Sequence, residues 1–182
     1  MYAGNRGEFQ GLSALVHAFG ECPGSQLVMV GEGVAKRRLM ALAQSLHLSN
    51  VSFRDQQAPD RVGQFISASD IQIVSLRDTP LMRVTMPSKL QTSLAAGRPI
   101  LAHAAGDVAD IVTRSGAGVI ALPGDRAGTL NAIRELQNRN SSELETMGRR
   151  ARKYYLEHFS QDAGLDRLEA MITGQPHGPR ER

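Results

Sequence analysis

The sequence predicts a doubly wound α/β fold, in which helices cover both faces of a parallel sheet of about six strands. Short apolar runs alternate with amphipathic stretches along most of the 182 residues. Apolar strands separated by helices are typical of parallel βαβ units, because such a sheet is buried on both faces. The expected strands are Met1–Gly4, Leu27–Gly31, Val51–Arg54, Ile71–Leu76, Pro99–His103 and Gly118–Leu122.

Helical patterns fill the intervals between these strands. The best defined follows the fourth strand, where Pro87 suits a first helical turn and Gly97 suits the position just past the last. Leu90, Leu94 and Gly97 share one face at helical spacing, so this face is expected to lie against the sheet. The expected helices are Phe9–Phe19, Ala35–Leu46, Asp60–Ala68, Ser88–Ala96, Val108–Arg114 and Ala127–Asn138.

Beyond these units the alternation ends and only helices are predicted. Ser141 or Ser142 is expected to cap a helix that runs towards Phe159, because acidic residues follow in its first turn. Ser160 is expected to cap a last helix that ends near Met171. We therefore predict one domain over residues 1–173, followed by a flexible tail over residues 174–182 that is polar and rich in glycine and proline.

Length and composition limit the possible classes of protein. A chain of 182 residues with 41% hydrophobic residues can form one domain with a full core. There is no apolar run long enough for a transmembrane helix, and the formal net charge of +3 does not argue for nucleic acid as a partner. Cys22 is the single cysteine, and the five histidines lack metal-ligand spacing, so neither a disulfide nor a metal site is expected.

The start of the helix at Pro87 is the strongest candidate for a binding site. A helix start presents unpaired N–H groups and the positive end of the helix dipole, which together favour a phosphate. Lys89 adds a mobile ammonium at the same end. Ser88 and Thr92 lie with Lys89 on the edge opposite to the apolar face. This segment is therefore predicted to bind a phosphate group.

Ligands of open parallel sheets bind at the carboxyl ends of the strands, so the loops there are the next candidates. The first, Gly4–Gly11, contains glycines that allow close approach of the backbone to a ligand, and the second contains Gly31, Glu32 and a further glycine. The third loop runs over residues 55–59 and includes Gln57. The fourth, residues 77–86, is long for such a connection and carries two arginines.

In order and spacing these segments resemble the donor half of the retaining, group 1 glycosyltransferases. That family typically has Pro-Ser-Lys-x-x-Glu-x-x-Ala-x-Gly-x-Pro at the helix start, a first loop Gly-Arg-x-x-x-x-Lys-Gly and a Val-Gly-x-Gly turn. The resemblance covers residues 1–172 and implies the Rossmann-like, C-terminal half of a GT-B enzyme, without its N-terminal acceptor domain. It implies donor contacts by Gly4, Asn5, Arg6, Gly31, Glu32, Gln57, Pro87, Ser88, Lys89 and Thr92.

The resemblance also implies an activity, which is transfer of a sugar from a nucleoside-diphosphate sugar to an acceptor, with retention of configuration and with no metal or other cofactor. The expected setting is the assembly of cell-surface polysaccharide or glycolipid. The isolated half is expected to bind nucleotide sugar and to transfer nothing. The expected location is the cytoplasm. The basic cluster formed by Arg149, Arg150, Arg152 and Lys153 is expected to be a solvated helix face, with contact to anionic lipid at the inner face of the membrane as the alternative.

The sequence departs from the family pattern at four positions. Asn5 and Gln10 replace the basic pair of the first loop, and Val84 and Thr92 replace two glutamates that lie near the sugar and the ribose in the family. Thr92 can still make one hydrogen bond to a ribose hydroxyl. Because both carboxylates are missing, no catalytic residue is assigned.

The departures leave alternatives to a divergent transferase open. One is a non-catalytic nucleotide-binding or interaction module derived from the same fold, and another is part of a GT-B epimerase that acts on UDP-sugars.

Two further residues near the carboxyl end of the fifth strand are candidates for contact with the ligand. Gly106 matches a family glycine that approaches the donor sugar, whereas His103 ends the fifth strand, where a structural or exposed position is expected over a ligand contact.

Overall fold

The computed structural model describes residues 1–174, in which all six predicted strands are present and parallel. They form two three-stranded ladders, β1-β2-β3 and β4-β5-β6, rather than one continuous ladder. The ladders meet where the Ile73 N–H donates to the Met1 carbonyl at 2.8 Å, so β1 and β4 lie side by side. The strands are β1 (Tyr2–Ala3), β2 (Leu27–Val30), β3 (Val51–Arg54), β4 (Gln72–Ser75), β5 (Ile100–His103) and β6 (Gly118–Ala121).

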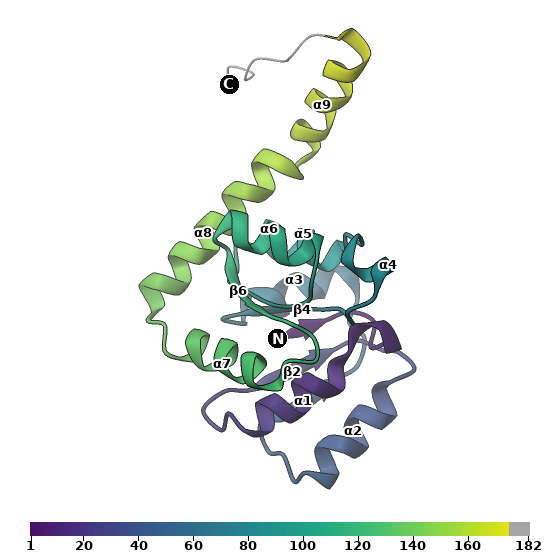
Figure 1. Cartoon of the computed structure of the whole chain (residues 1–182), viewed down its shortest axis with the longest axis vertical. Helices are drawn as coiled ribbons and strands as arrows, with labels where there is room; N and C mark the ends of the chain where they lie inside the picture. The colour runs from purple at the N-terminus through teal and green to yellow at the C-terminus, as the bar shows by residue number, and fades with distance from the viewer. Residues whose placement is uncertain (175–182) are drawn as a thin grey trace.

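Helices cover the strands on both sides, as predicted (Figure 1). Helices α1, α2 and α7 pack together in one layer, and α5, α6 and α8 pack together in the other. The helices are η1 (Glu8–Gln10), α1 (Leu12–Gly20), α2 (Lys36–Ser45), α3 (Pro59–Ser67), α4 (Pro80–Arg83), α5 (Ser88–Ala95), α6 (Asp107–Ser115), α7 (Arg126–Gln137), α8 (Ser141–His158) and α9 (Gln161–Thr173).

Two large hydrophobic clusters, and a smaller one formed by Met1, Val30 and Ile66, fill the space between the strands and the helices. Successive residues of a strand point to opposite faces. On β5, Ile100 and Ala102 therefore belong to the cluster beneath α5 and α6, whereas Leu101 belongs to the cluster beneath α1 and α7. Both faces of each central strand are buried, so successive residues of these strands are apolar in the sequence.

The prediction that Ser141 or Ser142 caps the long C-terminal helix was wrong. Asn140 is the cap of α8, because its Oδ1 accepts a hydrogen bond from the Glu143 N–H at 3.0 Å. The Glu143 carboxylate in turn accepts from the Asn140 N–H at 2.9 Å, which completes a capping box. The cap predicted at Ser160 for α9 is confirmed, since its Oγ accepts from the Ala163 N–H at 3.1 Å.

Two local differences from the predicted elements also have clear causes. The first helix begins at Leu12 rather than Phe9, because Gly11 adopts a φ of 60° that separates it from the short 3-10 turn η1. The loop predicted over residues 77–86 contains the short helix α4. Thr79 starts that helix by accepting a hydrogen bond at its Oγ1 from the Met82 N–H at 3.2 Å.

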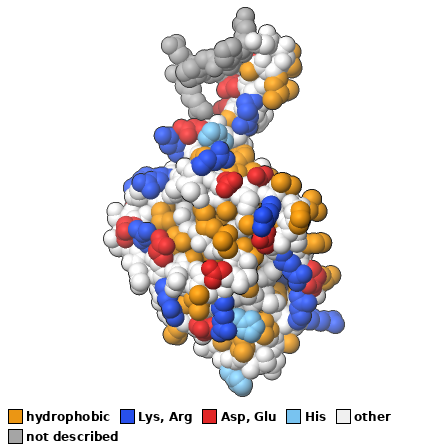
Figure 2. Space-filling view, in the orientation of Figure 1, with side chains coloured by type: hydrophobic (Ala, Val, Ile, Leu, Met, Phe, Trp, Pro, Cys, Tyr) orange, Lys and Arg blue, Asp and Glu red, His pale blue; other side chains and the backbone are white. Residues whose placement is uncertain are grey.

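Helix α9 extends away from the rest of the chain (Figure 1). Hydrophobic side chains gather on it at the top of the view in Figure 2. These side chains are exposed, and they are Leu165, Leu168, Met171 and Ile172. Except for Gly174, the predicted tail over residues 174–182 lies outside the residues that the structure describes.

Replacing the observed cap tests the start of α8. We expect Asn140→Ala to lower the free energy of unfolding by about 1 kcal/mol, because the Glu143 N–H loses the side-chain oxygen that accepts its hydrogen bond. Ser141→Ala is the matched control and should change stability by less than about 0.5 kcal/mol, since surface substitutions away from a cap usually do. Urea unfolding of both variants measures the difference. A larger loss for Ser141→Ala would restore the cap that the sequence predicted.

Candidate functional site

The loops after β1 and β2 approach each other so closely that only glycine fits between them. A Cβ added at Gly31 would lie 2.2 Å from the Gly4 carbonyl oxygen, and Gly31 has a φ of +130°. The backbone of each glycine is fixed to the next strand, because Gly4 N–H donates to Val30 O at 2.9 Å and Gly31 N–H to Arg54 O at 3.1 Å. Three strand ends are thereby held together at one edge.

Lys89 joins this edge from α5, as the sequence predicts. Its Nζ lies 4.5 Å from the centroid of the Tyr2 ring, and a Cβ added at Gly4 would come within 2.9 Å of the same nitrogen. The ammonium therefore rests between an aromatic face and a bare glycine, an arrangement that is attractive for a cation. The sequence analysis did not identify Tyr2 as a site residue, because its contact with Lys89 joins segments far apart in the chain.

The ammonium of Lys89 is the electrostatically unusual group of the site. Of the three lysines in the chain, Lys36 and Lys153 form ion pairs with carboxylates, whereas Lys89 has no carboxylate partner among residues 1–174. Burial lowers its pKa from the usual 10.5 to about 8, since the charged form is poorly solvated. An anion at this position would relieve that cost.

The start of α5 adds to the same positive region. Pro87 precedes the helix in an extended conformation, and no side chain of the cap residue accepts a hydrogen bond from the first turn. Ser88 is exposed there, and Thr92 lies one turn further along, where its hydroxyl donates to the Ser88 carbonyl at 3.0 Å. The Thr92 oxygen is therefore free to accept a hydrogen bond, whereas its proton is already used.

Arg6 does not face solvent, whereas a guanidinium that binds a phosphate ligand must be accessible. Its side chain is 0% exposed, and its Nη2 donates to the Arg54 carbonyl at 2.7 Å, with the guanidinium 5.7 Å from the Phe53 ring. Burial lowers its pKa, and the nearby carboxylates of Glu32 and Asp55 oppose that shift. Its Nε and Nη1 have no hydrogen-bond partner among residues 1–174. In this structure Arg6 ties the first loop to the end of β3.

Asn5, Glu32 and Gln57 lie around the hydrogen bond between Arg6 and the Arg54 carbonyl. The Asn5 carbonyl accepts from the Tyr2 hydroxyl at 2.5 Å, and a Cβ added at Gly33 would come within 2.5 Å of the Asn5 side chain. Gln57 caps its own loop by donating from Nε2 to the Asp55 carbonyl at 3.0 Å. These predicted residues are thus brought together at the ends of β1, β2 and β3.

Lys36 is a second residue that the sequence analysis left out of the site. Its Nζ bridges Glu32 at 2.5 Å and Asp55 at 2.6 Å, and the hydrogen bonds to the two carboxylates raise its pKa. The spacing of Glu32 and Lys36, four residues apart at a helix start, is the sequence signal that identifies such a pair. The bridge joins the loop after β2 to the loop after β3.

Among the positions that depart from the family pattern, Val84 is the apolar one. Val84 is 68% exposed and offers no hydrogen bond where the family has its first glutamate. Gly106 approaches the end of α4, because a Cβ added there would lie 2.1 Å from the Arg83 carbonyl oxygen. The close contact between α4 and the start of α6 therefore needs glycine at this position.

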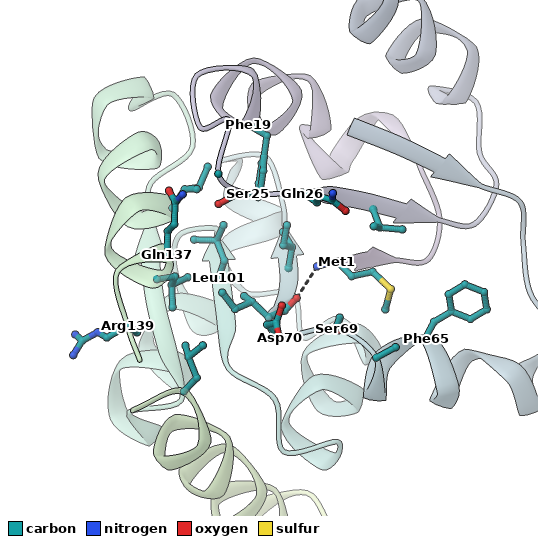
Figure 3. Close-up of a pocket in the computed structure, with 18 residues that line it drawn as sticks. Met1, Phe19, Ser25, Gln26, Phe65, Ser69, Asp70, Leu101, Gln137 and Arg139 are labelled. Carbon is teal, nitrogen blue, oxygen red and sulfur yellow. Dashed lines mark hydrogen bonds between the residues drawn. The ribbon is translucent and has the colours of Figure 1, made fainter. Parts of the chain in front are cut away.

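The largest described cavity lies at the opposite, amino end of the strands (Figure 3). It has a volume of about 520 Å³, and none of the predicted donor residues lines it. The Met1 amino group forms part of its wall and donates to the Ile71 carbonyl at 2.6 Å. Burial lowers the pKa of this amino group to about 5, although the charge of Asp70 favours its protonated form.

No helix among residues 1–174 is both long and apolar enough to span a membrane. Within the same residues, no three His, Cys, Asp or Glu side chains lie close enough together to hold a metal ion.

Comparison of the sequence with known families gives a clear match. The model of the family described as "Glycosyl transferases group 1" matches residues 1–139, which confirms the family that the motifs resemble. A relative is WcaI of Escherichia coli (strain K12), named as a glycosyl transferase of colanic acid biosynthesis. It is 32% identical over 99 residues, which are 53% of this chain and 24% of WcaI.

Solved structures share the fold. HepE of Anabaena, in complex with UDP-glucose, has a TM-score of 0.78 at 17% identity, over 96% of this chain and 49% of HepE. WaaG, a glycosyltransferase involved in lipopolysaccharide biosynthesis, has a TM-score of 0.69 at 19% identity, over 96% of this chain and 46% of WaaG. The parallel α/β fold is thereby confirmed. The chain spans less than half the length of these relatives.

Because the first two loops approach each other so closely, adding a single methyl group at Gly31 is expected to lower the stability of the fold strongly. Gly31→Ala should lower the free energy of unfolding by about 3 kcal/mol, because the Cβ meets backbone and the φ is strained. Gly63→Ala in the exposed middle of α3 is the matched control, where nothing lies within 4 Å. It should instead gain about 0.5–1 kcal/mol. Equal effects in urea unfolding would contradict this geometry.

The buried ammonium of Lys89 predicts a gain in stability when it is removed. Lys89→Met should raise the free energy of unfolding by about 1 kcal/mol near pH 7, because an uncompensated buried charge is replaced by an apolar chain. Between a folded pKa of about 8 and the usual 10.5, the unfolded chain binds more protons, so wild-type stability rises with pH. The advantage of the variant should therefore shrink as the pH rises through this range.

Urea unfolding at several pH values, with the exposed Lys153→Met as control, measures this dependence. A destabilising effect of Lys89→Met at neutral pH would show that the ammonium is compensated in solution.

Proposed function

Because the chain belongs to the group 1 glycosyl transferases, we propose that it is the donor-binding half of a two-domain glycosyltransferase. The full enzyme would transfer a sugar from a nucleoside-diphosphate sugar to an acceptor. One observation carries the proposal, namely that the Lys89 ammonium lies beside Gly4 without a carboxylate partner, at a helix start. A diphosphate supplies the missing negative charge at that point.

The same geometry supports a role in the chemical step. Negative charge grows on the diphosphate as the bond to the sugar breaks, and fixed positive groups stabilise such charge most effectively. Lys89 and the first turn of α5 are held in place before the ligand arrives, because Nζ is packed against Tyr2 and Gly4. The proposed reaction proceeds with retention of configuration and without a metal ion.

Thr92 and the loop after β3 complete the proposed nucleotide site. The free lone pairs of Thr92 would accept a hydrogen bond from a ribose hydroxyl. The loop that carries Gln57 would contact the base, with Arg6 holding the end of β3 beneath it. The structure of HepE with UDP-glucose supports a UDP-sugar as the first donor to test.

The remaining parts of the proposal concern the whole enzyme. The acceptor would be bound by the second domain of the full enzyme, so residues 1–174 by themselves would bind nucleotide sugar and transfer nothing. The exposed apolar side chains of α9 suit contact with such a domain. The names of WcaI and WaaG support a role in polysaccharide or glycolipid assembly, and the proposed place is the cytoplasm at the inner face of the membrane.

A second candidate function is a non-catalytic nucleotide-binding module. The exposure of Val84 favours it, because no carboxylate stands near the transferred sugar. The two candidate functions differ in how much the sugar of the nucleotide sugar adds to the binding affinity. A donor site should bind UDP-glucose more tightly than UDP, whereas a module that reads the nucleotide alone should bind both equally.

Titration of the chain with UDP, GDP and ADP, followed by amide shifts in NMR spectra, tests the proposed site. We expect saturable shifts at Gly4, Gly31 and residues 87–92, and Lys89→Met should weaken UDP binding about tenfold because a charge-assisted contact is lost. Uridine, which lacks the diphosphate, should bind equally to both proteins. Lys153→Met is the control of equal charge and should bind UDP like the wild type. The proposal fails if no nucleotide binds at millimolar concentration, or if Lys89→Met binds UDP unchanged.

A further inference from the structure

Lys89 differs from the other two lysines of the chain in what surrounds its amino group. Lys36 bridges two carboxylates, and Lys153 pairs with a third at 3.7 Å. Nζ of Lys89 lies against the Tyr2 ring and has neither a hydrogen bond nor an ion pair among residues 1–174. It can therefore lose its proton without breaking a hydrogen bond.

The amino group of Lys89 also remains accessible, although its side chain is partly covered. Among residues 1–174, the unpaired side-chain nitrogens that are fully buried belong to Arg6 and His103, and Nζ of Lys89 is not among them. Since Nζ has no hydrogen-bond partner, it must keep contact with solvent. A Cβ at Gly4 would come within 2.9 Å of Nζ, so the bare glycine leaves the nitrogen uncrowded on that side. A small reagent can therefore reach this amine.

The surroundings of Nζ favour the neutral amine. Burial lowers the pKa of Lys89 to about 8, and no charged side chain contributes to this shift. The phenol of Tyr2 faces Nζ, and burial raises its pKa, so it stays neutral. About a tenth of Lys89 is then neutral at pH 7, against about 0.03% of an amine with the usual pKa of 10.5. Only the neutral amine has a lone pair for attack on an electrophile.

The same surroundings favour an anionic electrophile. No carboxylate pairs with Nζ, and the first turn of α5 has no side-chain cap on its N–H groups. Negative charge is favourable at such a helix start. The proposed function places a diphosphate there, and an acyl phosphate combines a similar anion with a reactive carbonyl group.

We propose that Lys89 is a modification site, at which an acyl phosphate converts the amine to a neutral amide. The ammonium first loses a proton to water. The nitrogen lone pair then attacks the carbonyl carbon, and a C–N bond forms while the bond from that carbon to the phosphate oxygen breaks. Phosphate leaves with the electron pair of the broken bond, and the surplus proton on nitrogen passes to water.

The modification would regulate the proposed donor site, and this part of the inference rests on the proposed function. Acylation removes the charge of a lysine. The amide of Lys89 would offer no ammonium to a diphosphate, and the acyl group would occupy space beside Gly4. Acylation would therefore prevent the nucleotide from binding.

Treatment of the chain with acetyl phosphate, followed by mass spectrometry of its peptides, measures the acylation rate of each lysine in one sample. Lys36 and Lys153 are internal controls. At pH 7, Lys89 should react at least about tenfold faster than Lys153, because its larger neutral fraction outweighs the weaker nucleophilicity of a less basic amine. The rate at Lys89 should level off above about pH 8, whereas the rate at Lys153 should keep rising.

The chain unfolded in urea is the matched control for structure. Unfolding removes Lys89 from Tyr2 and Gly4, so its amine should regain an ordinary pKa. The three lysines should then react at equal rates.

UDP separates this inference from the proposed function. UDP bound beside Lys89 should protect this lysine and leave Lys153 reactive. If no nucleotide binds, the proposed donor site fails, whereas fast acylation of Lys89 still supports the modification site. Lys89→Gln resembles an acetylated lysine and should bind UDP about tenfold more weakly than the wild type, whereas Lys89→Arg keeps the charge and should lose less affinity.

Three results would overturn the inference. One is a rate at Lys89 in the folded chain that does not exceed the rate at Lys153 at pH 7. Another is a preference for Lys89 that persists in urea, since it would then come from the local sequence rather than from the packing of Nζ. The third, which concerns regulation, is an equal affinity of the wild type and of folded Lys89→Gln for UDP.

Discussion

Burial of a parallel sheet on both faces is the constraint from which the rest of this molecule follows. Ile100, Leu101 and Ala102 of β5 alternate between two apolar clusters, so the middle of the strand is surrounded by apolar side chains on both faces. Polar chemistry is therefore confined to the ends of the strands, where the loops leave the sheet. Because Gly4 and Gly31 approach each other closely, the loops after β1, β2 and β3 form one continuous surface.

The two buried cations at this surface are accommodated in different ways. Arg6 uses its fork of donors to hold a backbone carbonyl of β3, which suits a group that stabilises the loop arrangement. Lys89 instead rests on the Tyr2 ring without a carboxylate, at a cost visible in its lowered pKa. In the proposed donor site, an anion that binds beside the ammonium would offset this cost in stability.

Around Lys89 the same edge of the sheet is positive, because the ammonium has no carboxylate partner among residues 1–174 and stands at the start of α5. In the proposed donor site this charge would face the diphosphate. The chain spans less than half of the length of its relatives.

The sequence by itself determined the six strands, most of the helices and the family, because these depend on local periodicity, turn residues and ordered motifs. It also placed Lys89 correctly at a helix start. The N-cap of α8 was predicted at the wrong residue, because asparagine and serine are equally good caps. Only the hydrogen bonds with Glu143 show that Asn140 is the cap. Tertiary structure alone decided that Arg6 is buried, that Tyr2 lies against Lys89 and that Ser75 lies within hydrogen-bond distance of His103. These contacts join segments far apart in the chain, and no local pattern encodes such distances.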